Sequence, residues 1–304
     1  MHKIKISFIL FGFFSSLMVT AQDLEPRSLS NIPIKGNFAV ASYAYSEGNI
    51  LVDNTLPIED LNASLNNFVF AYARSFKLFN KLAKVDVILP YSVGEFSGKV
   101  TDIDSSTYRN GFGDPAVRLS LILIGAKPLS GADFMKQEQQ KFKLGVSLRI
   151  RPPLGQYDSS KLINLGANRW AAKFGFAASY DLNKKWILES QYNTWFFTKN
   201  NSFFNGNTTQ QKPLTTLQVH VTHIFKPGIW ASVSYGLSRL GETVVNDIDK
   251  NDPQNSSRFG AAFAHRLGKK SSIKFAFTSG ITARYGADFN TFALAYQFMW
   301  FDKK

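Results

Sequence analysis

The sequence has no cysteine among its 304 residues, which excludes disulfide bonds and metal sites built from thiolates. After its first residues it has no run of about 18 apolar residues, so no transmembrane helix is expected further along. Acidic residues are few, at 22 against 35 Lys and Arg, and the formal net charge is +13. Aromatic residues, in contrast, make up 14% of the chain, although the mean hydropathy is −0.12. This combination favours strands with one apolar and one polar face over a single dry core.

The N-terminus has the three parts of a secretory leader. Lys3 and Lys5 form a basic start, residues 6–19 are apolar, and Val19-Thr20-Ala21 is a small-residue cleavage site. We therefore expect residues 1–21 to be removed and residues 22–304 to form one domain with a net charge of +11, since two lysines are lost. The alternative is an N-terminal anchor helix, but the apolar run is short for that role.

The stretch "KFKLGVSLRIRPPLG", residues 141–155, shows the pattern that governs the rest of the chain. Phe142, Leu144, Val146, Leu148 and Ile150 occupy one parity, and the other parity carries lysine, glycine, serine and arginine. A period of two predicts a β-strand with one apolar and one cationic face.

The same alternation recurs, and it predicts an all-β fold: a transmembrane, up-and-down antiparallel β-barrel of about 12 strands. The first, second and seventh strands alternate less cleanly, so the sequence does not assign their inward faces. The expected strands lie near 36–46, 67–76, 84–94, 115–124, 141–151, 169–180, 185–197, 214–225, 229–237, 258–267, 272–283 and 289–301.

The connections alternate between long and short, as in outer-membrane barrels with long outer loops and short periplasmic turns. The long ones are 47–66, 95–114, 152–168, 198–213 and 238–257, and the short ones are 77–83, 181–184, 226–228 and 268–271. Two connections break the rule: 125–140, where we expect a small helix capped near Ser130 at the periplasmic rim, and the short 284–288. An even number of strands places both termini on the periplasmic side.

Strand length separates a membrane barrel from a soluble sandwich, which would show a similar alternation. Strands in soluble sheets average about five or six residues, whereas a membrane-spanning strand needs about nine to eleven. Most of the expected strands reach the longer figure, so the apolar parity should face lipid and the cationic parity a wet lumen. The five tryptophans lie near strand ends, as interfacial belts require, although parity points Trp195 and Trp230 inward.

Two stretches, "NGFGDPAVRLSL" at 110–121 and "RPPLGQYDSSKLINLGANRW" at 151–170, resemble the outer-membrane proteins grouped as "MetA-pathway of phenol degradation". The second carries the more specific spacing, and the resemblance covers essentially the whole mature chain. It implies an outer-membrane β-barrel that takes up aromatic or other small organic compounds. The chain departs from the usual barrel ending, because Asp302-Lys303-Lys304 follow Phe301.

Loop 152–168 is the connection with the most distinctive chemistry. Pro152-Pro153 ends strand pairing, and Gly155 and Gly166 are expected to allow sharp turns. Tyr157, Asn168 and Arg169 either fold into the mouth as a constriction or solute contact, or the loop only packs the barrel rim.

The inward parity carries an excess of cations, which concentrates anions inside low-dielectric walls. The alternative is a plugged lumen, in which these charges only pair with one another. Remaining cations are expected to meet lipopolysaccharide phosphates at the rim. The expected inward cations are Lys84, Arg118, Lys143, Arg149, Arg151, Lys173, Arg258, Arg266 and Lys274, with Asp86 and Glu189 as inward carboxylates.

Catalytic and metal motifs are weak. An outer-membrane phospholipase needs a Ser-His-Asn set, and no local motif for one accompanies His220, His223 or His265. Asp102 and Asp104 lack the full acidic ladder of a calcium loop. The basic residues are dispersed over strands, so nucleic acid is not an expected partner.

The sequence therefore predicts a passive outer-membrane channel or transporter for small organic, aromatic or anionic solutes, with no cofactor. The alternatives are a structural or interaction barrel without transport, and a lipid-modifying enzyme. A hydrophobic cargo leaving sideways through the wall is a further variant. The sequence does not assign the oligomeric state. The residues expected to contact the lumen or a solute are Arg118, Lys143, Arg149, Arg151, Lys173, Tyr157, Asn168, Arg169 and Glu189.

Overall fold

The computed structural model describes residues 24–51, 58–138, 140–283 and 286–302. The leader predicted at residues 1–21 lies outside this part. Within the described ranges, no helix has the length and apolar character needed to cross a bilayer.

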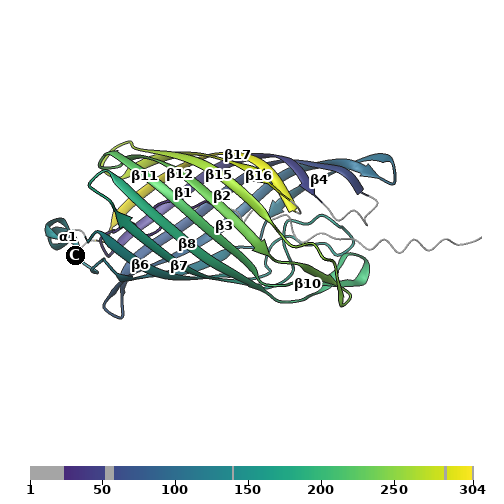
Figure 1. Ribbon diagram of the computed structural model, residues 1–304, viewed down its shortest axis with the longest axis horizontal. Coiled ribbons are helices and arrows are strands. Elements are labelled where there is room, and N and C mark those ends of the chain that lie inside the picture. The colour runs from purple at the N-terminus through teal and green to yellow at the C-terminus, as the bar shows by residue number, and fades with distance from the viewer. Residues whose placement is uncertain (1–23, 52–57, 139, 284–285, 303–304) are drawn as a thin grey trace, which may run out of the picture.

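Twelve antiparallel strand positions close into a β-barrel, as predicted (Figure 1). The order around the wall is β2-β1-β17-β16-β15-β12-β11-β8-β7-β6-β5-β3, and the pairing of β2 with β3 closes the ring. The strands are β1 (Gly36–Leu51), β2 (Ile58–Leu78), β3 (Lys81–Val100), β5 (Ala116–Ile124), β6 (Phe142–Arg151), β7 (Ala171–Asp181), β8 (Trp186–Phe197), β11 (Leu214–Lys226), β12 (Ile229–Leu240), β15 (Ser256–Arg266), β16 (Ser271–Thr282) and β17 (Gly286–Phe301).

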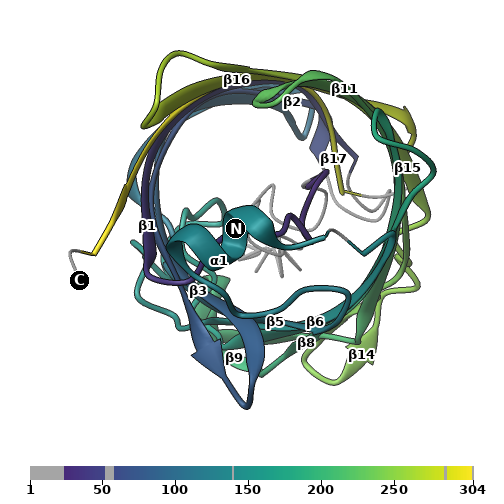
Figure 2. The same ribbon diagram turned by 90° about the vertical axis from the view of Figure 1, so that its left-hand side faces the viewer.

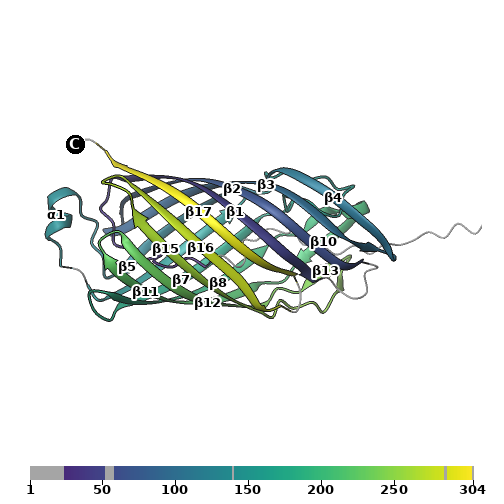
Figure 3. The same cartoon turned by 90° about the horizontal axis from the view of Figure 1, so that it is seen from above.

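Viewed along its axis, the barrel is a ring of strands with chain inside it (Figure 2). Viewed from above, the strands cross the barrel obliquely, which is the tilt that closing a sheet requires (Figure 3). At one end of the barrel the strands are joined by tight turns. Strands β2 and β3, for example, are joined by Phe79 and Asn80 alone, and both have the positive φ that two-residue hairpin turns prefer. We refer to this end as the short-turn end and to the other as the long-loop end.

On one side, strand β3 pairs with two different strands along its length. The part of β3 from Tyr91 to Val100 pairs with β4 (Ile103–Phe112), whereas the part from Leu82 to Ile88 pairs with β5. Residues 113–115, Gly-Asp-Pro, separate the two short strands, and the proline has no N–H to donate to a ladder.

The two faces of the wall have opposite chemistry. Phe70, Phe176 and Val233 on the outside are 55%, 58% and 65% exposed, whereas inward Glu189 and His220 are 3% and 0% exposed. Contiguous exposed apolar surface of this extent is unfavourable in water and favourable against lipid chains. The parity predicted from the sequence is thus the parity of a transmembrane barrel.

At the long-loop end, residues predicted as loops form strands. Predicted loop 198–213 contains β9 (Asn200–Phe203), the 3-10 turn η2 (Phe204–Gly206) and β10 (Asn207–Gln211), and predicted loop 238–257 contains β13 (Thr243–Val245) and β14 (Ile248–Asp249). These four strands make a second sheet, β14-β13-β10-β9. Strands β2 and β3 likewise extend to 21 and 20 residues, and take up much of predicted loops 47–66 and 95–114. Strands β9 and β10 carry few apolar side chains on either face. In the extensions of β2 and β3, by contrast, apolar side chains such as Leu61, Leu65 and Phe96 are buried.

At the short-turn end, the helix predicted within 125–140 is α1 (Gly131–Lys136). Ser130 occupies the N-cap position, as predicted, but its side chain makes no capping hydrogen bond. In Figure 2, α1 lies across the opening of the ring.

Candidate functional site

The N-terminal segment, residues 24–35, lies inside the barrel (Figure 2). Leu29 packs with Leu82 and Ile122 in a small apolar cluster near the short-turn end. The backbone N–H of Ile34 donates to the carbonyl of Leu129, which joins the segment to the connection that carries α1. The segment therefore has an anchor at one end of the lumen.

Glycines on inward-facing positions make room for the segment. A Cβ added to Gly145 on β6 would lie 2.5 Å from the Leu29 side chain, and one added to Gly236 on β12 would lie 2.9 Å from Leu24. These glycines serve a close approach between chain and wall rather than an unusual backbone angle.

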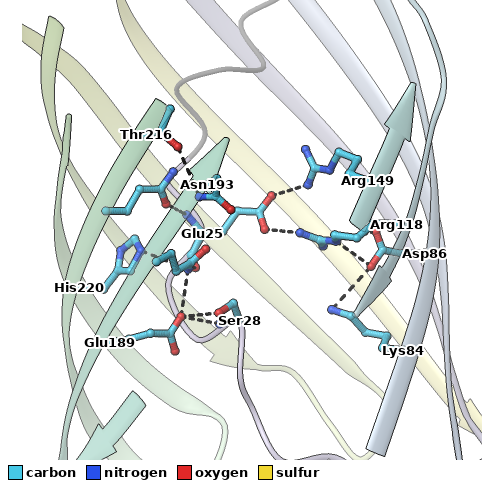
Figure 4. Close-up of polar contacts among 12 residues, drawn as sticks. Glu25, Ser28, Lys84, Asp86, Arg118, Arg149, Glu189, Asn193, Thr216 and His220 are labelled. Carbon is cyan, nitrogen blue, oxygen red and sulfur yellow. Dashed lines mark hydrogen bonds and ion pairs between the residues drawn. The ribbon is translucent and has the colours of Figure 1, made fainter. Parts of the chain in front are cut away.

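Glu25 is the polar centre of the segment (Figure 4). One carboxylate oxygen pairs with Arg149 at 2.7 Å, and the other accepts a hydrogen bond from Arg118. The backbone is held as well: Gln191 donates to the Glu25 carbonyl at 2.6 Å, and the Glu25 N–H donates to Gln218. Two strands, β5 and β6, thus hold the side chain, and two others, β8 and β11, hold the backbone.

Glu25 belongs to the N-terminal segment and not to a spanning strand. Burial raises the pKa of Glu25, but the positive charges of Arg118, Arg149 and Lys173 outweigh it and hold that pKa well below its ordinary value. The carboxylate is therefore ionised at neutral pH.

Arg118 connects this centre to β3. Its Nε lies 3.1 Å from both carboxylate oxygens of Asp86, and Lys84 lies 3.7 Å from the same carboxylate (Figure 4). The expected inward positions of Lys84, Asp86 and Arg118 are what the structure shows.

Glu189 on β8 also holds the segment. Its Oε1 accepts hydrogen bonds from the backbone N–H of Ser28 at 2.9 Å and from the Ser28 hydroxyl at 2.6 Å. Lys143, in contrast, pairs with Asp181 of β7 at 2.9 Å near the short-turn end. Glu189 and Lys143 both face inward, as expected from the sequence.

Arg151, Arg169 and Lys173 lie toward the long-loop end, packed on aromatic rings. Arg151 and Lys173 lie 5.3 and 5.1 Å from the centre of the Trp195 ring. Arg169 lies 4.5 Å from the centre of the Phe197 ring and donates to Gln211 at 2.6 Å. All three cations are buried, so this end of the wall is a packed cation–π core.

Loop 152–168 packs against the rim. The Tyr157 hydroxyl donates to the Ser202 carbonyl and accepts a hydrogen bond from Asn200, and Asn168 also donates to Asn200. In the same loop, Ile163 packs in a buried apolar cluster with Leu61 of β2, Phe96 of β3 and Phe289 of β17. The loop therefore makes contacts at the rim and also inside the mouth of the barrel. Gly155 and Gly166 have ordinary φ; they are needed because an added Cβ would lie within 2.6 and 2.7 Å of backbone atoms.

His220 and His223 have different surroundings. His220 lies 2.7 Å from the Ser234 hydroxyl and 3.3 Å from Gln191, so a serine, a histidine and an amide side chain meet there. His220 is, however, fully buried in the wall. His223 faces outward, with its ring tilted against Trp186 and edge-to-face with Phe225. In the described part of the chain, no group of three or more His, Asp or Glu is placed to hold a metal ion.

A cavity of about 630 Å³ lies beside the N-terminal segment, toward β1, β2, β3, β16 and β17. It is lined by residues of the segment from Pro26 to Ile32 and by cavity-facing side chains of these strands and of β5, β12 and β15, among them Arg118. Sequence reasoning missed the segment, because residues 24–35 show no alternation. The glycines on an otherwise polar parity were the one signal that something packs there.

A closed barrel with an apolar exterior and a partly filled, polar interior defines the class: a transmembrane β-barrel of the outer-membrane type. The chain belongs to the family described as "Putative MetA-pathway of phenol degradation", whose model matches residues 43–296. This confirms the resemblance carried by residues 110–121 and 151–170.

Solved structures share the fold. An outer membrane channel from Pseudomonas putida F1 is 18% identical with a TM-score of 0.79, covering 91% of this chain and all of the other. The transport unit of the autotransporter AIDA-I from Escherichia coli is 9% identical with a TM-score of 0.54, covering 95% of each chain. The β-domain of the Bordetella autotransporter BrkA is 12% identical with a TM-score of 0.50, covering 87% of this chain and 99% of the other. No curated protein matches the chain.

Proposed function

We propose that this protein is a passive outer-membrane channel for small organic solutes. The observation that carries the proposal is the cavity of about 630 Å³ beside the N-terminal segment. The family match, and the likeness to a barrel whose title calls it an outer membrane channel, support it. The leader at residues 1–21 would deliver the chain across the inner membrane.

In this proposal the long-loop end faces the outside, as in other outer-membrane barrels, and the short-turn end faces the periplasm. A solute enters between the long loops and leaves past α1. Lipopolysaccharide would surround the outer half, where rim cations meet its phosphates. The transport is diffusive and uses no cofactor.

The proposed path follows the β1–β3 and β16–β17 side of the lumen. On the opposite side the N-terminal segment covers Arg149 and Glu189. Of the residues expected to contact a solute, we assign that role to Arg118, which lines the cavity. The others shape the wall, hold the segment or secure the rim.

Two measurements test the proposal. Single-channel recording in planar bilayers should show discrete conductance steps. Swelling of liposomes in matched anionic, cationic and aromatic solutes should be faster with the protein than without it. Absence of both conductance and swelling, with barrel folding verified by heat-dependent gel mobility, would rule out the channel.

One observation favours the alternative of a closed interaction barrel: the segment lies in the lumen and is fixed by the ion pair of Glu25 with Arg149 at 2.7 Å and by the apolar cluster around Leu29. The same recordings separate the two, because a closed barrel conducts no ions. The lipid-modifying enzyme has less support, since His220 is buried. Loss of a measured lipase activity in His220→Ala would revive it.

A further inference from the structure

The cavity beside the N-terminal segment has two chemically different sides. We propose that it binds organic monocarboxylates, small anions with one charged end and an apolar body. This deepens the proposed channel function and rests on it, because it names the solute class that the cavity selects.

The charged side of the cavity has many more cations than carboxylates. Asp86 is the one carboxylate among the described residues that line it, and Lys84 and Arg118 already share Asp86. The cations that line it are Arg27, Lys84, Arg118, Arg266, Lys270 and Lys274. An anion entering this space meets net positive charge inside a low-dielectric wall.

Lys274 is the cation on which the proposed site chiefly depends. It lies on β16, faces the cavity and is exposed to it. No described residue forms a hydrogen bond or ion pair with its ammonium group. It lies three positions from the start of β16, and Lys84 lies three positions from the start of β3, so the two cations stand at a similar depth near the short-turn end.

The other side of the cavity is apolar. Val40 pairs with Ala71, and Ala71 pairs with Ile88, so these three inward side chains form one row across β1, β2 and β3. Along β3 the next inward residue after Ile88 is Asp86, about 7 Å away at the rise of a strand. A charged row and an apolar row are therefore neighbours.

This arrangement distinguishes between kinds of anion. An inorganic anion would use only the cations, and the apolar row would remain wet. An organic carboxylate would place its charge at the cations and remove apolar surface from water against the row. The volume of about 630 Å³ is in the range of small-molecule sites, which hold about 300–1,000 Å³.

Calorimetric titration of the purified barrel in a non-ionic detergent tests the site. The probes are benzoate, benzylammonium and benzyl alcohol, which share one ring, and acetate, which has the charge without it. We expect benzoate to bind most tightly, acetate and benzyl alcohol more weakly, and benzylammonium not at all. Equal affinity for benzoate and benzylammonium, or for benzoate and acetate, would overturn the proposal.

A substitution series locates the charge. Lys274→Gln should weaken benzoate binding about tenfold, the usual scale for a hydrogen bond to a charged group, and Lys274→Arg should restore most of it. The matched control is Lys226→Gln, an exposed lysine at the end of β11. An unchanged benzoate affinity in Lys274→Gln would refute the assignment. If that variant fails to fold, the comparison of the four probes on the unmodified protein still decides.

Conductance separates this inference from the channel itself. A barrel that conducts ions and passes neutral solutes but shows no preference for benzoate would overturn only the monocarboxylate site. A barrel that neither conducts nor passes solutes would overturn the channel, whatever the titration shows.

Discussion

Asp114 accepts a hydrogen bond from the backbone N–H of Gly155 at 2.8 Å. Its second carboxylate oxygen accepts one from Ala167, also at 2.8 Å, and Asp114 is buried. The aspartate lies in the break between β4 and β5, and the two amides belong to loop 152–168. The two stretches that carry the family resemblance, far apart in sequence, therefore meet at a single carboxylate.

Asp114→Ala should destabilise the long-loop end. The substitution leaves the buried amide of Ala167 without an acceptor, at a cost of about 1–3 kcal/mol, and the partly buried amide of Gly155 at a smaller cost. We expect the barrel to lose its heat-resistant gel mobility at a lower temperature. Asp104→Ala, an exposed aspartate on β4, is the matched control. An equal transition temperature for both variants would show that Asp114 does not fix the loop.

Gly155→Ala should have a similar effect for a steric reason. The added Cβ would lie 2.6 Å from the backbone nitrogen of Asp114 and 2.7 Å from the carbonyl carbon of Gly113, and neither backbone atom belongs to a flexible side chain that could turn away. Gly268→Ala is the control, because nothing lies within 4 Å of its Cβ. We expect a lower melting temperature and faster protease cleavage in loop 152–168 only for the first variant. Cleavage at the same rate in both would contradict the close approach.

The sequence was sufficient to predict the barrel wall but not the strands at the long-loop end. Strands such as β6 can be recognised in the sequence, because contact with lipid requires apolar side chains at every second position from Phe142 to Ile150. The first strands alternate poorly because inward positions such as Val40 and Ala71 are apolar too, and those positions form the apolar row of the cavity. Strands β9, β10, β13 and β14 form a separate sheet at the long-loop end, where this alternation is absent, so their sequences resemble loops.

Glu25→Gln should loosen the N-terminal segment. The substitution removes the charge that pairs with Arg149 at 2.7 Å and with Arg118. Arg149 loses its carboxylate partner, whereas Arg118 keeps its ion pair with Asp86. Since the chain has no cysteine, a single Ser30→Cys variant reports on the segment through its rate of maleimide labelling. We expect faster labelling and larger conductance when Glu25→Gln is added. An unchanged labelling rate would mean that the remaining contacts, including those of Ser28 and Leu29, hold the segment without the Glu25 charge.

The conductance of the unmodified barrel should change little between about pH 7 and about pH 5. The folded pKa of Glu25 is depressed, so its ion pairs contribute fully above the unfolded value of about 4.3. They are lost only as the pH falls through the lower, folded value. Conductance steps that rise already near pH 5 would show that another group controls the segment.

Trp195→Leu should destabilise the barrel more than Trp186→Leu. Trp195 is 2% exposed and supports Arg151 and Lys173, so its loss leaves a cavity and removes two cation–π contacts, together about 2–4 kcal/mol. Trp186 is 42% exposed on the lipid side. Thermal unfolding followed by heat-dependent gel mobility compares the two, and equal midpoints would contradict the packed core.

The interior could be predicted only in part, because the sequence shows which side chains face inward but not what they meet. Arg149 and Glu189 were expected in the lumen and lie there, yet their partners come from residues 24–35, which have no periodic pattern. Glycine on an inward position is ambiguous in sequence: Gly236 reads as a gap in the polar face until Leu24 is seen against it.

Gly236→Val tests whether the wall was shaped for the segment. The nearest atom to an added Cβ is the Leu24 side chain at 2.9 Å, and the next is a backbone oxygen at 4.0 Å, so the strand itself tolerates the change. Valine also suits a β-strand, and folding should be unaffected. We expect Leu24 to be displaced, with faster labelling of Ser30→Cys and larger conductance. Ala231→Val adds similar bulk to the outward face of the same strand and should change neither the labelling rate nor the conductance. Equal labelling and conductance in the two variants would mean that Leu24 does not pack against Gly236 of β12.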